Sequence, residues 1–358
     1  MLSETPHKLH YFRVSPSAQD KFKIPNAFWI GLQSVGLTPG TVLRHSNLPL
    51  TIYDGEKNLV STAQFFAIWR AVNELNAGPD AALMLVKRIE VEHYHPSSLA
   101  ALHARTFRDA LSRMARYKQL CCAEEMRIAE GKTQCVIDFS WPFAEETEPP
   151  LLTDATFATV TELGRRGTKT KLNPKRVELR RAPDPGHIHE AYFQCAVKYG
   201  ARRNAIILRT SDLDLPFVTH NADLIEMLAP QLDQQLAGRK AQAKIADQVK
   251  WVLKRLLSGS RPDILIVAKE LGMGARTLQR RITNEGASFR LLLNEARQEL
   301  VRQYLSDPAI EINETAFLLG YEDPNSFYRA FRTWEGTTPA HWRSTRLASA
   351  QRLPFSRC

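Results

Sequence analysis

The chain has 358 residues and a mass of 40.6 kDa, which is too long for one ordinary domain and suits two. Its composition, 44% hydrophobic and 24% charged, is that of a globular protein and excludes wholesale disorder. Forty-eight lysines and arginines against 38 acidic residues give a net charge of +10, which favours a polyanionic partner such as nucleic acid.

The cysteine content and the hydropathy pattern indicate the compartment in which the chain works. Five cysteines without a CxxC spacing argue against a disulfide framework and favour a reducing environment. The polar amino terminus lacks the apolar core of a signal peptide, and no window approaches the roughly 18 apolar residues of a membrane span. We therefore expect a soluble, cytoplasmic protein with no membrane partner.

Helical spacing of apolar residues begins near residue 24, after a polar stretch, residues 1–23, that we interpret as a flexible tail. The 3.6-residue period predicts helices over about 24–35, 61–75, 80–89 and 98–118. A change of period then predicts two strands within residues 126–139, joined by a turn at Glu130-Gly131.

Helices and short strands continue to residue 238. Helical spacing returns over 151–164 and about 189–196, and residues 177–180 and 205–208 have the pattern of strands. Because these elements do not alternate regularly as βα units, the predicted class for residues 24–238 is α+β. A last helix, about 221–237, ends at Gly238, and the polar residues 238–240 are the best linker candidate.

The helix predicted over 221–237 carries an apolar stripe with two interpretations. Its members are Leu224, Met227, Leu228, Leu232 and Leu236. The stripe is either an interface between two copies of the chain or a surface that packs on its own domain. The first interpretation would make residues 24–238 a dimerisation domain.

Two segments of the carboxy-terminal third, residues 264–282 and 312–331, share one plan. Each has a short helix with an alanine, a Leu-Gly turn, and a second helix with an apolar pair four residues apart. A small alanine lets the helices approach closely, and glycine accepts the left-handed backbone of the turn. The matching residues are Ala268 and Ala316, Gly272 and Gly320, Leu278/Ile282 and Phe327/Phe331. The plan is that of a helix-turn-helix, which predicts an all-α domain over 241–346 and a tail over 347–358.

Polar side chains occupy the face of each second helix that lies away from the apolar pair. They are Arg276, Gln279, Arg280 and Thr283 in the first copy, and Asn325, Tyr328 and Arg329 in the second. Arginine pairs with guanine edges in the major groove, and Gln or Asn pairs with adenine. The helical stretch 289–305 between the copies would span about 25 Å, enough to hold two reading helices about one DNA turn apart.

Residues 250–345 resemble the double helix-turn-helix domain of the AraC/XylS family of transcription regulators, most specifically over residues 320–343. The resemblance places Arg276, Gln279, Arg280 and Thr283 at base-reading positions of the first recognition helix. It places Asn325, Ser326, Tyr328 and Arg329 at those of the second, and Arg281 and Arg332 where phosphate contacts are expected. Gly274 departs from the family, which commonly has Ser at that helix cap, although Gly still caps acceptably.

The region from about residue 27 to residue 236 resembles the ligand-binding domain of the OruR/VirS-type branch of that family. The shared stretches include residues 111–117 and 192–207, and the pattern departs near Arg181, where several matching domains carry His. The resemblance implies a bacterial, sequence-specific DNA-binding regulator whose DNA affinity responds to an unknown small-molecule effector. We therefore expect residues 24–238 to be an effector-binding and dimerisation domain, with a mainly apolar pocket where the aromatic helices of residues 27–75 meet the strands after residue 125. The partners it implies are double-stranded operator or promoter DNA, a second copy of the chain, and RNA polymerase if the protein is an activator.

Several residue clusters outside the recognition helices admit a sharper interpretation and a plainer one. The basic run 165–181 is interpreted as a flexible loop, or else as a contact for DNA backbone or an anionic effector. Cys121-Cys122 is interpreted as inert packing, or else as a nucleophile. His93-x-His95 and His187-x-His189 are interpreted as hydrogen-bonding residues, or else as metal ligands, although no third ligand is placed by the sequence.

An enzymatic interpretation has no support, because GxGxxG, P-loop, GxSxG and HExxH motifs do not occur. We therefore expect no catalytic residue, no cofactor and no metal site. The alternative to a regulator is a DNA-repair alkyl acceptor, since AraC-type domains also occur fused to cysteine methyl-acceptor modules. That alternative needs a four-cysteine zinc site and a Pro-Cys-His-Arg nucleophile, and the sequence has neither.

Overall fold

The structure is a computed structural model that describes residues 20–54, 59–75, 78, 80–183, 186–242, 244–257, 262–307 and 310–351. The chain forms two compact units. The first takes in Gln19–Trp141 and Glu148–Ala241, and the second takes in Pro142–Thr147 and the residues from Gln242 onward.

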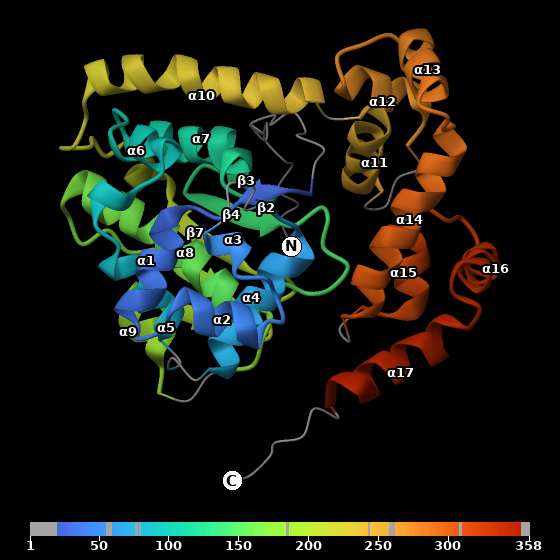
Figure 1. Ribbon diagram of the computed structural model, residues 1–358, viewed down its shortest axis with the longest axis horizontal. Coiled ribbons are helices and arrows are strands. Elements are labelled where there is room, and N and C mark those ends of the chain that lie inside the picture. Colours follow the sequence, from blue (N-terminus) through green and yellow to red (C-terminus); the bar gives the residue numbers. More distant parts are fainter. Residues whose placement is uncertain are drawn as a thin grey trace. The chain divides into compact units, whose positions relative to one another are not determined.

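The first unit combines helices with a five-stranded sheet (Figure 1), which confirms the predicted α+β class. Its helices are α1 Asn26–Ser34, α2 Pro39–His45, α3 Thr51–Asp54, α4 Thr62–Glu74, α5 Ala81–Arg88, α6 Pro96–Leu102, α7 Phe107–Tyr117, α8 Pro150–Thr168, α9 Ile188–Phe193 and α10 Ala222–Gln242. Its strands are β1 Phe22–Lys23, β2 Leu59–Val60, β3 Glu125–Glu130, β4 Gln134–Ser140, β5 Arg176–Glu178, β6 Ala196–Lys198 and β7 Ala205–Arg209.

The sheet has the order β3-β4-β7-β5-β6, in which only the β5–β6 pair is parallel. The predicted hairpin is confirmed, because β3 and β4 pair antiparallel with Glu130 opposite Cys135. Four of the five residues of the central strand β7 are buried, as expected for a strand with neighbours on both sides. Strand β6 was not predicted, because three alternately exposed residues give too short a pattern.

Three boundaries differ from the prediction. The helix expected over 98–118 is two helices, because Thr106 caps a new one by accepting a hydrogen bond from the Asp109 amide. Helix α10 does not end at Gly238 but continues to Gln242, so the linker candidate 238–240 is helical. Residues 1–19 lie outside the described part, yet strand β1 pairs with β2 and buries Phe22, so the tail expected over 1–23 ends before that residue.

The apolar stripe of α10 packs largely on its own unit. Leu232 and Leu236 are buried against Ala100, Tyr117 and Leu120, with Leu228 packed beside them. Figure 1 shows α10 lying along α6 and α7. Of the predicted stripe, Met227 is the residue that remains largely exposed, at 62%. The own-domain interpretation therefore holds for the carboxy-terminal half of the stripe.

The regular elements of the second unit are all helices in its described residues, as predicted. Its helices are α11 Ile245–Leu256, α12 Ile264–Glu270, α13 Ala275–Asn284, α14 Phe289–Leu305, α15 Ile312–Leu318, α16 Pro324–Glu335 and α17 Pro339–Gln351. One apolar core joins them and includes Val267, Leu278, Val301 and Phe327. Helix α17 extends into the tail expected over 347–358, and residues 352–358 lie outside the described part.

Both predicted helix-turn-helix units are present, formed by α12–α13 and by α15–α16. Ala268 and Ala316 are buried where the helices approach, and Gly272 and Gly320 both turn with φ of 69°. Helix α14 lies between the two helix-turn-helix motifs (Figure 1). Its buried Arg297 donates hydrogen bonds to the carbonyl oxygens of Leu319 and Gly320, and so fixes the second turn.

None of the helices in the described residues combines the length and the apolar content needed to cross a membrane.

Candidate nucleic-acid interface and ligand cavity

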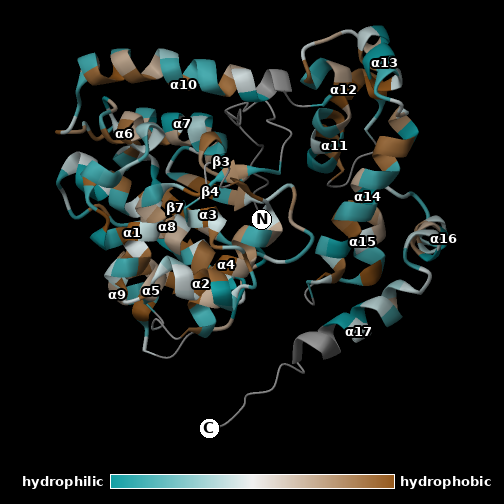
Figure 2. Ribbon diagram, viewed as in Figure 1, coloured by the Kyte–Doolittle hydropathy of each residue, from teal (hydrophilic) through white to brown (hydrophobic). Residues whose placement is uncertain are grey.

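Helix α13 buries one face and exposes the opposite one. Leu278 and Ile282 are fully buried in the core of the second unit. A helix turns by about 100° per residue, so Arg276 and Arg280, which are four residues apart, lie on one face and both point away from that pair. All five candidate residues of this helix are exposed: Arg276, Gln279, Arg280, Arg281 and Thr283. Figure 2 shows the hydrophilic colour along α13.

The two ends of α13 are held differently. Gly274 at its amino end offers no side-chain cap, as the sequence predicted. Just beyond its carboxy end, Glu285 accepts hydrogen bonds from the backbone amides of Ile245 and Ala246, at 2.8 and 2.9 Å. These bonds cap the first turn of α11 with a carboxylate and tie α13 to the rest of the unit.

Helix α16 begins at a strong cap. Pro324 occupies its first turn, and the Asp323 carboxylate accepts hydrogen bonds from the Asn325 and Ser326 amides. These backbone hydrogen bonds, chiefly the one from Asn325, hold the pKa of Asp323 below its usual value. The side-chain amide of Asn325 and the hydroxyl of Ser326 also donate to the same carboxylate. Two candidate base-reading side chains are therefore ordered in the absence of DNA.

The remaining candidates of α16 differ in exposure. Arg329 and Arg332 are exposed, whereas Tyr328 is half-buried with its ring 5.6 Å from that of Phe327. Arg329 donates to the Ser326 hydroxyl at 3.3 Å. Tyr328 therefore contributes to the core of the unit as well as to the face predicted to read bases.

The arginines of these two faces have no acidic partner among the residues that the structure describes. Within the described ranges, Arg276, Arg280, Arg281 and Arg332 form no ion pair with a carboxylate. Other arginines of the second unit do: Arg255 pairs with Glu270, and Arg302 with Glu335. Unpaired guanidinium groups on an exposed helix face are the arrangement that phosphates and guanine edges require.

The first unit contains a cavity of about 240 Å³. Its wall is mainly apolar, with Phe28 from α1, Phe65 and Trp69 from α4, and Leu152 from α8. The sequence predicted an apolar pocket where the aromatic helices of residues 27–75 meet the strands after residue 125. The aromatic helices α1 and α4 do line the cavity, but the sheet strands themselves do not. Helix α8 lines it as well, and Trp141 and Glu124 lie just beyond the ends of β4 and β3.

Two polar clusters line the same cavity. Lys118 pairs with Glu124 at 2.6 Å; burial alone would lower the pKa of Lys118, but this carboxylate more than offsets it and raises the pKa. The second cluster is formed by His95, Ser97 and Cys121. The sequence predicted neither cluster, because their members come from separate elements.

The basic run 165–181 covers the end of α8, the loop 169–175 and strand β5, and it lies outside this cavity. Arg165 pairs with Glu162 and donates to the carbonyl oxygen of Leu172. Arg166 donates to the carbonyl oxygens of Ile89 and Lys87 and to the Tyr94 hydroxyl. None of the cationic residues of this run lines the cavity. The run therefore gives no reason to expect an anionic ligand in this cavity.

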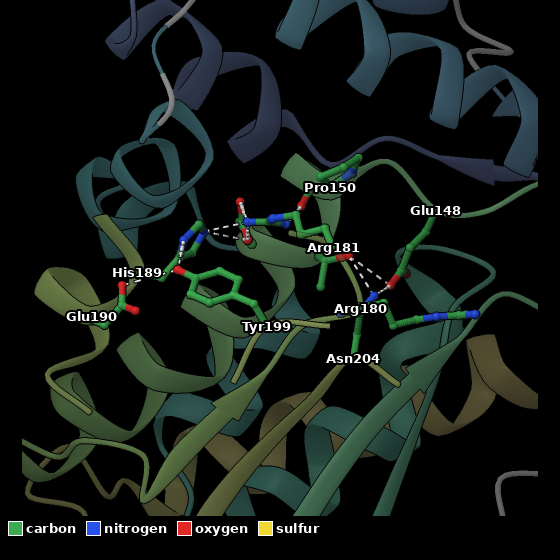
Figure 3. A network of polar contacts seen from close by, with 10 residues as sticks. Glu148, Pro150, Arg180, Arg181, His189, Glu190, Tyr199 and Asn204 are labelled. Atoms are coloured by element: carbon green, nitrogen blue, oxygen red, sulfur yellow. Dashed lines mark hydrogen bonds and ion pairs between the residues drawn. The ribbon is translucent and has the colours of Figure 1, made fainter. Parts of the chain in front are cut away.

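Arg181 belongs to a largely buried network of polar contacts (Figure 3). Its Nη2 donates to both oxygens of Asp154, at 2.8 and 2.9 Å, and to Nε2 of His189 at 2.6 Å. Because this nitrogen accepts, Nδ1 of His189 carries the proton and donates to the Tyr199 hydroxyl, which donates to Glu190. The network joins α8, α9 and the segment that follows β5. Arg181 therefore stabilises the packing of these elements.

Neither histidine pair lies in an arrangement of metal ligands within the described residues. His93 ends a short 3₁₀ turn and His95 caps α6, so neither lies on a strand facing the other. His187 is 86% exposed, whereas His189 is fully buried in the network above. In the part of the chain that the structure describes, no group of three or more His, Cys, Asp or Glu residues could hold a metal ion.

Two family matches cover both units. Residues 36–217, half of the chain, match the family described as the arabinose-binding domain of AraC transcription regulators, and residues 267–345 match a helix-turn-helix domain family. The chain belongs to the AraC family of transcription regulators. The resemblance stated from the sequence is thereby confirmed, and the DNA-repair alternative is not favoured.

Individual relatives agree with this assignment. The Ornithine utilization regulator of Pseudomonas aeruginosa is 28% identical over 163 residues, 45% of this chain and 48% of that protein. The HTH-type transcriptional regulator VirS of Mycobacterium tuberculosis is 32% identical over 102 residues, 28% of this chain and 30% of that protein. In both cases the match spans about half or less of the relative's length.

Among solved structures, the transcriptional regulator CdpR from Pseudomonas aeruginosa is 20% identical, and the match covers 86% of this chain and 96% of that one, with a TM-score of 0.40. A TM-score this low supports no comparison of detail.

Proposed function

We propose that this AraC-family protein is a sequence-specific DNA-binding transcription regulator that places α13 and α16 in successive major grooves. The observation that carries the proposal is the matched pair of helix faces whose arginines have no acidic partner in the described residues. The residues proposed to read bases are Arg276, Gln279, Arg280, Thr283, Asn325, Ser326, Tyr328 and Arg329. Arg281 and Arg332 are proposed to contact phosphates.

The length of α14 supports simultaneous reading by both helices. Its 17 residues span about 25 Å, and its ends adjoin the two helix-turn-helix units. Selection of binding sequences from a random DNA library by the full-length protein tests the proposal. We expect a consensus with two conserved half-sites about one helical turn apart. A protein that enriched no sequence over the starting library would contradict it.

We further propose that residues 241–346 form an autonomous DNA-binding domain and residues 24–238 an effector-binding domain. Support comes from the separate apolar core of the second unit, which draws on α11 to α16. The fragment 241–346 should bind the selected DNA site at matched salt. If it folded, by circular dichroism, but bound no site that the full protein binds, its autonomy would be disproved.

The effector is proposed to be a small, mainly apolar molecule that binds the cavity of the first unit. The aromatic walls favour apolar surface, and the one lysine in the lining is already paired with Glu124. For the effector to regulate, it must bind two states of the protein with different affinity, and a coupling of about 1–3 kcal/mol changes operator affinity 5- to 150-fold. Thermal-shift screening of the full-length protein, followed by operator titration, tests this.

We also propose that the protein forms a homodimer. If it is an activator, it is proposed to contact RNA polymerase as well. The carboxy-terminal half of the α10 stripe is occupied by its own unit, so a dimer would have to use another surface. Light scattering at micromolar concentration, with and without the selected DNA, distinguishes a monomer from a dimer.

A further inference from the structure

Cys121 lies in the cavity wall next to a histidine and a serine. Its Sγ is 3.1 Å from Oγ of Ser97 and 3.4 Å from Nδ1 of His95. Oγ of Ser97 is itself 2.8 Å from the same Nδ1. The imidazole can therefore take the thiol proton directly or through the Ser97 hydroxyl, which is how histidine activates a cysteine.

Helix capping explains part of this arrangement. His95 is the amino-terminal cap of α6, and its Nδ1 accepts from the backbone amide of Ser97 at 3.2 Å. That bond fixes Nδ1 as an acceptor in the neutral imidazole. Capping does not require a thiol at this nitrogen, and Cys121 reaches it from a different segment, 26 residues along the chain.

The charges around Cys121 favour its thiolate. Burial alone would raise the pKa of Cys121, but His95, Ser97 and the Lys118 ammonium more than offset it, so the pKa lies below its usual value. Arg239 adds a second cation nearby, and Glu124 neutralises part of the Lys118 charge.

The other described cysteines have the opposite surroundings. Burial is the main cause that raises the pKa of Cys122 to about 12, of Cys135 to about 12 and of Cys195 to about 11. At neutral pH the thiolate population of Cys121 therefore exceeds that of each of these three.

The cavity sets the kind of molecule that reaches this thiol. A dry cavity of about 150 Å³ holds benzene, so one of about 240 Å³ holds a substituted aromatic ring or a short aliphatic chain. Trp69 is in the lining, and its buried indole N–H has no hydrogen-bond acceptor among the described residues. A ligand with an apolar body and one carbonyl oxygen would satisfy that donor.

We propose that Cys121 adds covalently to apolar α,β-unsaturated carbonyl compounds that enter this cavity. The thiolate sulfur forms a bond to the β-carbon, and the π electrons of the carbon–carbon double bond move to give an enolate. The proton that left the thiol returns from His95 to the α-carbon, so the product is a saturated thioether and no oxidant or reductant is consumed. This inference deepens the proposed function, because it gives the effector of the cavity a chemical class.

The test uses the full-length protein and 4-phenyl-3-buten-2-one, with its saturated analogue 4-phenyl-2-butanone as the unreactive control. Intact-mass spectrometry should show one adduct per chain, and peptide mapping should place it on Cys121. At pH about 7 labelling of Cys121 should exceed that of Cys122 or Cys195 more than about tenfold. An excess of the saturated analogue should slow the labelling, because both compounds occupy one cavity.

Two cysteine variants and one histidine variant sharpen the test. Cys121→Ser should abolish the adduct, whereas Cys122→Ser, next to it in the chain, should label at the wild-type rate. His95→Asn should move the pH profile of labelling to higher pH, a change that loss of a helix cap alone would not produce. Equal labelling of the described cysteines, or labelling that the saturated analogue does not slow, would overturn the proposal.

The DNA-binding readout separates this inference from the proposed function. An adduct on Cys121 that changes operator affinity at least about fivefold supports both. An adduct that leaves operator affinity unchanged supports capture of the electrophile and contradicts its role as effector. Sequence-specific binding without any adduct supports the regulator and overturns the role of Cys121.

Discussion

Two arginine-rich regions of this chain, the recognition helices and residues 165–181, have similar compositions but differ in the partners of their guanidinium groups. In the basic run, Arg165, Arg176 and Arg181 pair with Glu162, Glu178 and Asp154. On α13 and α16, Arg280 and Arg332 have no carboxylate partner in the described ranges. The first group stabilises its own unit, and the second is available to a polyanion.

The difference comes from the elements that face each region. Helix α8 contributes Asp154 and Glu162 to the inner side of the basic run, where both are buried. The exposed faces of α13 and α16 point away from the core that Leu278, Ile282, Phe327 and Phe331 form, so their arginines meet no buried acid among the described residues. A count of basic residues cannot distinguish these cases, whereas their partners do.

The largest expected effect is that of Arg181→Met on the stability of the first unit. Loss of the guanidinium leaves the buried Asp154 carboxylate without its cation, so we expect the free energy of unfolding to fall by about 3–5 kcal/mol. Urea denaturation measures this. Arg176→Met removes a more exposed pair in the same run, with Glu178, and should cost less than about 1 kcal/mol. Equal losses in the two variants would contradict the distinction between buried and exposed arginines.

The second expected effect concerns the arginines proposed to read bases. Arg280→Ala and Arg329→Ala should each weaken operator binding by about 1–3 kcal/mol and relax the consensus at a few positions. Their unfolding free energies should remain close to the wild-type value, because both side chains are exposed. Site selection with each variant checks the consensus. An unchanged consensus for Arg280→Ala would remove this residue from the reading face.

The sequence predicted the second unit better than the first. The alanine, the glycine turn and the apolar pair of each helix-turn-helix lie within 20 residues of one another, so local spacing determines them. The Arg181–Asp154 pair joins residues 27 positions apart, and Cys121 meets His95 across 26 positions. Such long-range contacts depend on how the helices pack against one another. The spacing of apolar residues along the sequence carries no information about them.

Short elements account for the remaining differences in the first unit. The period of 98–118 continues smoothly through residues that belong to two helices, and only the Thr106 cap marks the break. Glycine at 238 suggested the end of a helix, yet its backbone is not left-handed and α10 continues. Propensity signals of this kind are weak, and tertiary packing overrides them.

The third expected effect is smaller and independent of sequence. Arg332→Ala should weaken binding to all DNA sequences alike and lower the slope of log affinity against log salt by about one. The reason is that a phosphate contact releases about one counterion without reading a base. Operator and random DNA titrated over a range of salt concentrations provide the measurement. A change in the consensus would instead assign Arg332 to the reading face.

The smallest expected effect is the pH dependence of the α16 cap. The pKa of Asp323 is lowered in the folded protein, chiefly by the hydrogen bond from the Asn325 amide. Its stabilisation is therefore fully present above the unfolded pKa and is lost as the pH falls through the lowered folded value. Hydrogen-exchange protection of the Asn325 and Ser326 amides, corrected for intrinsic rates, should decline over that range in the wild type.

Two variants at this position separate the charge of the cap from its hydrogen bonds. Asp323→Asn keeps a good cap without a titrating group, so its protection should vary little with pH. Asp323→Ala should lose protection at every pH and should weaken operator binding, because Asn325 and Ser326 lose the carboxylate that orders them. If Asp323→Ala bound operator DNA as tightly as the wild type, the order that the cap imposes on these two side chains would contribute nothing to recognition. The second recognition helix would then resemble the first, whose glycine cap orders no base-reading side chain.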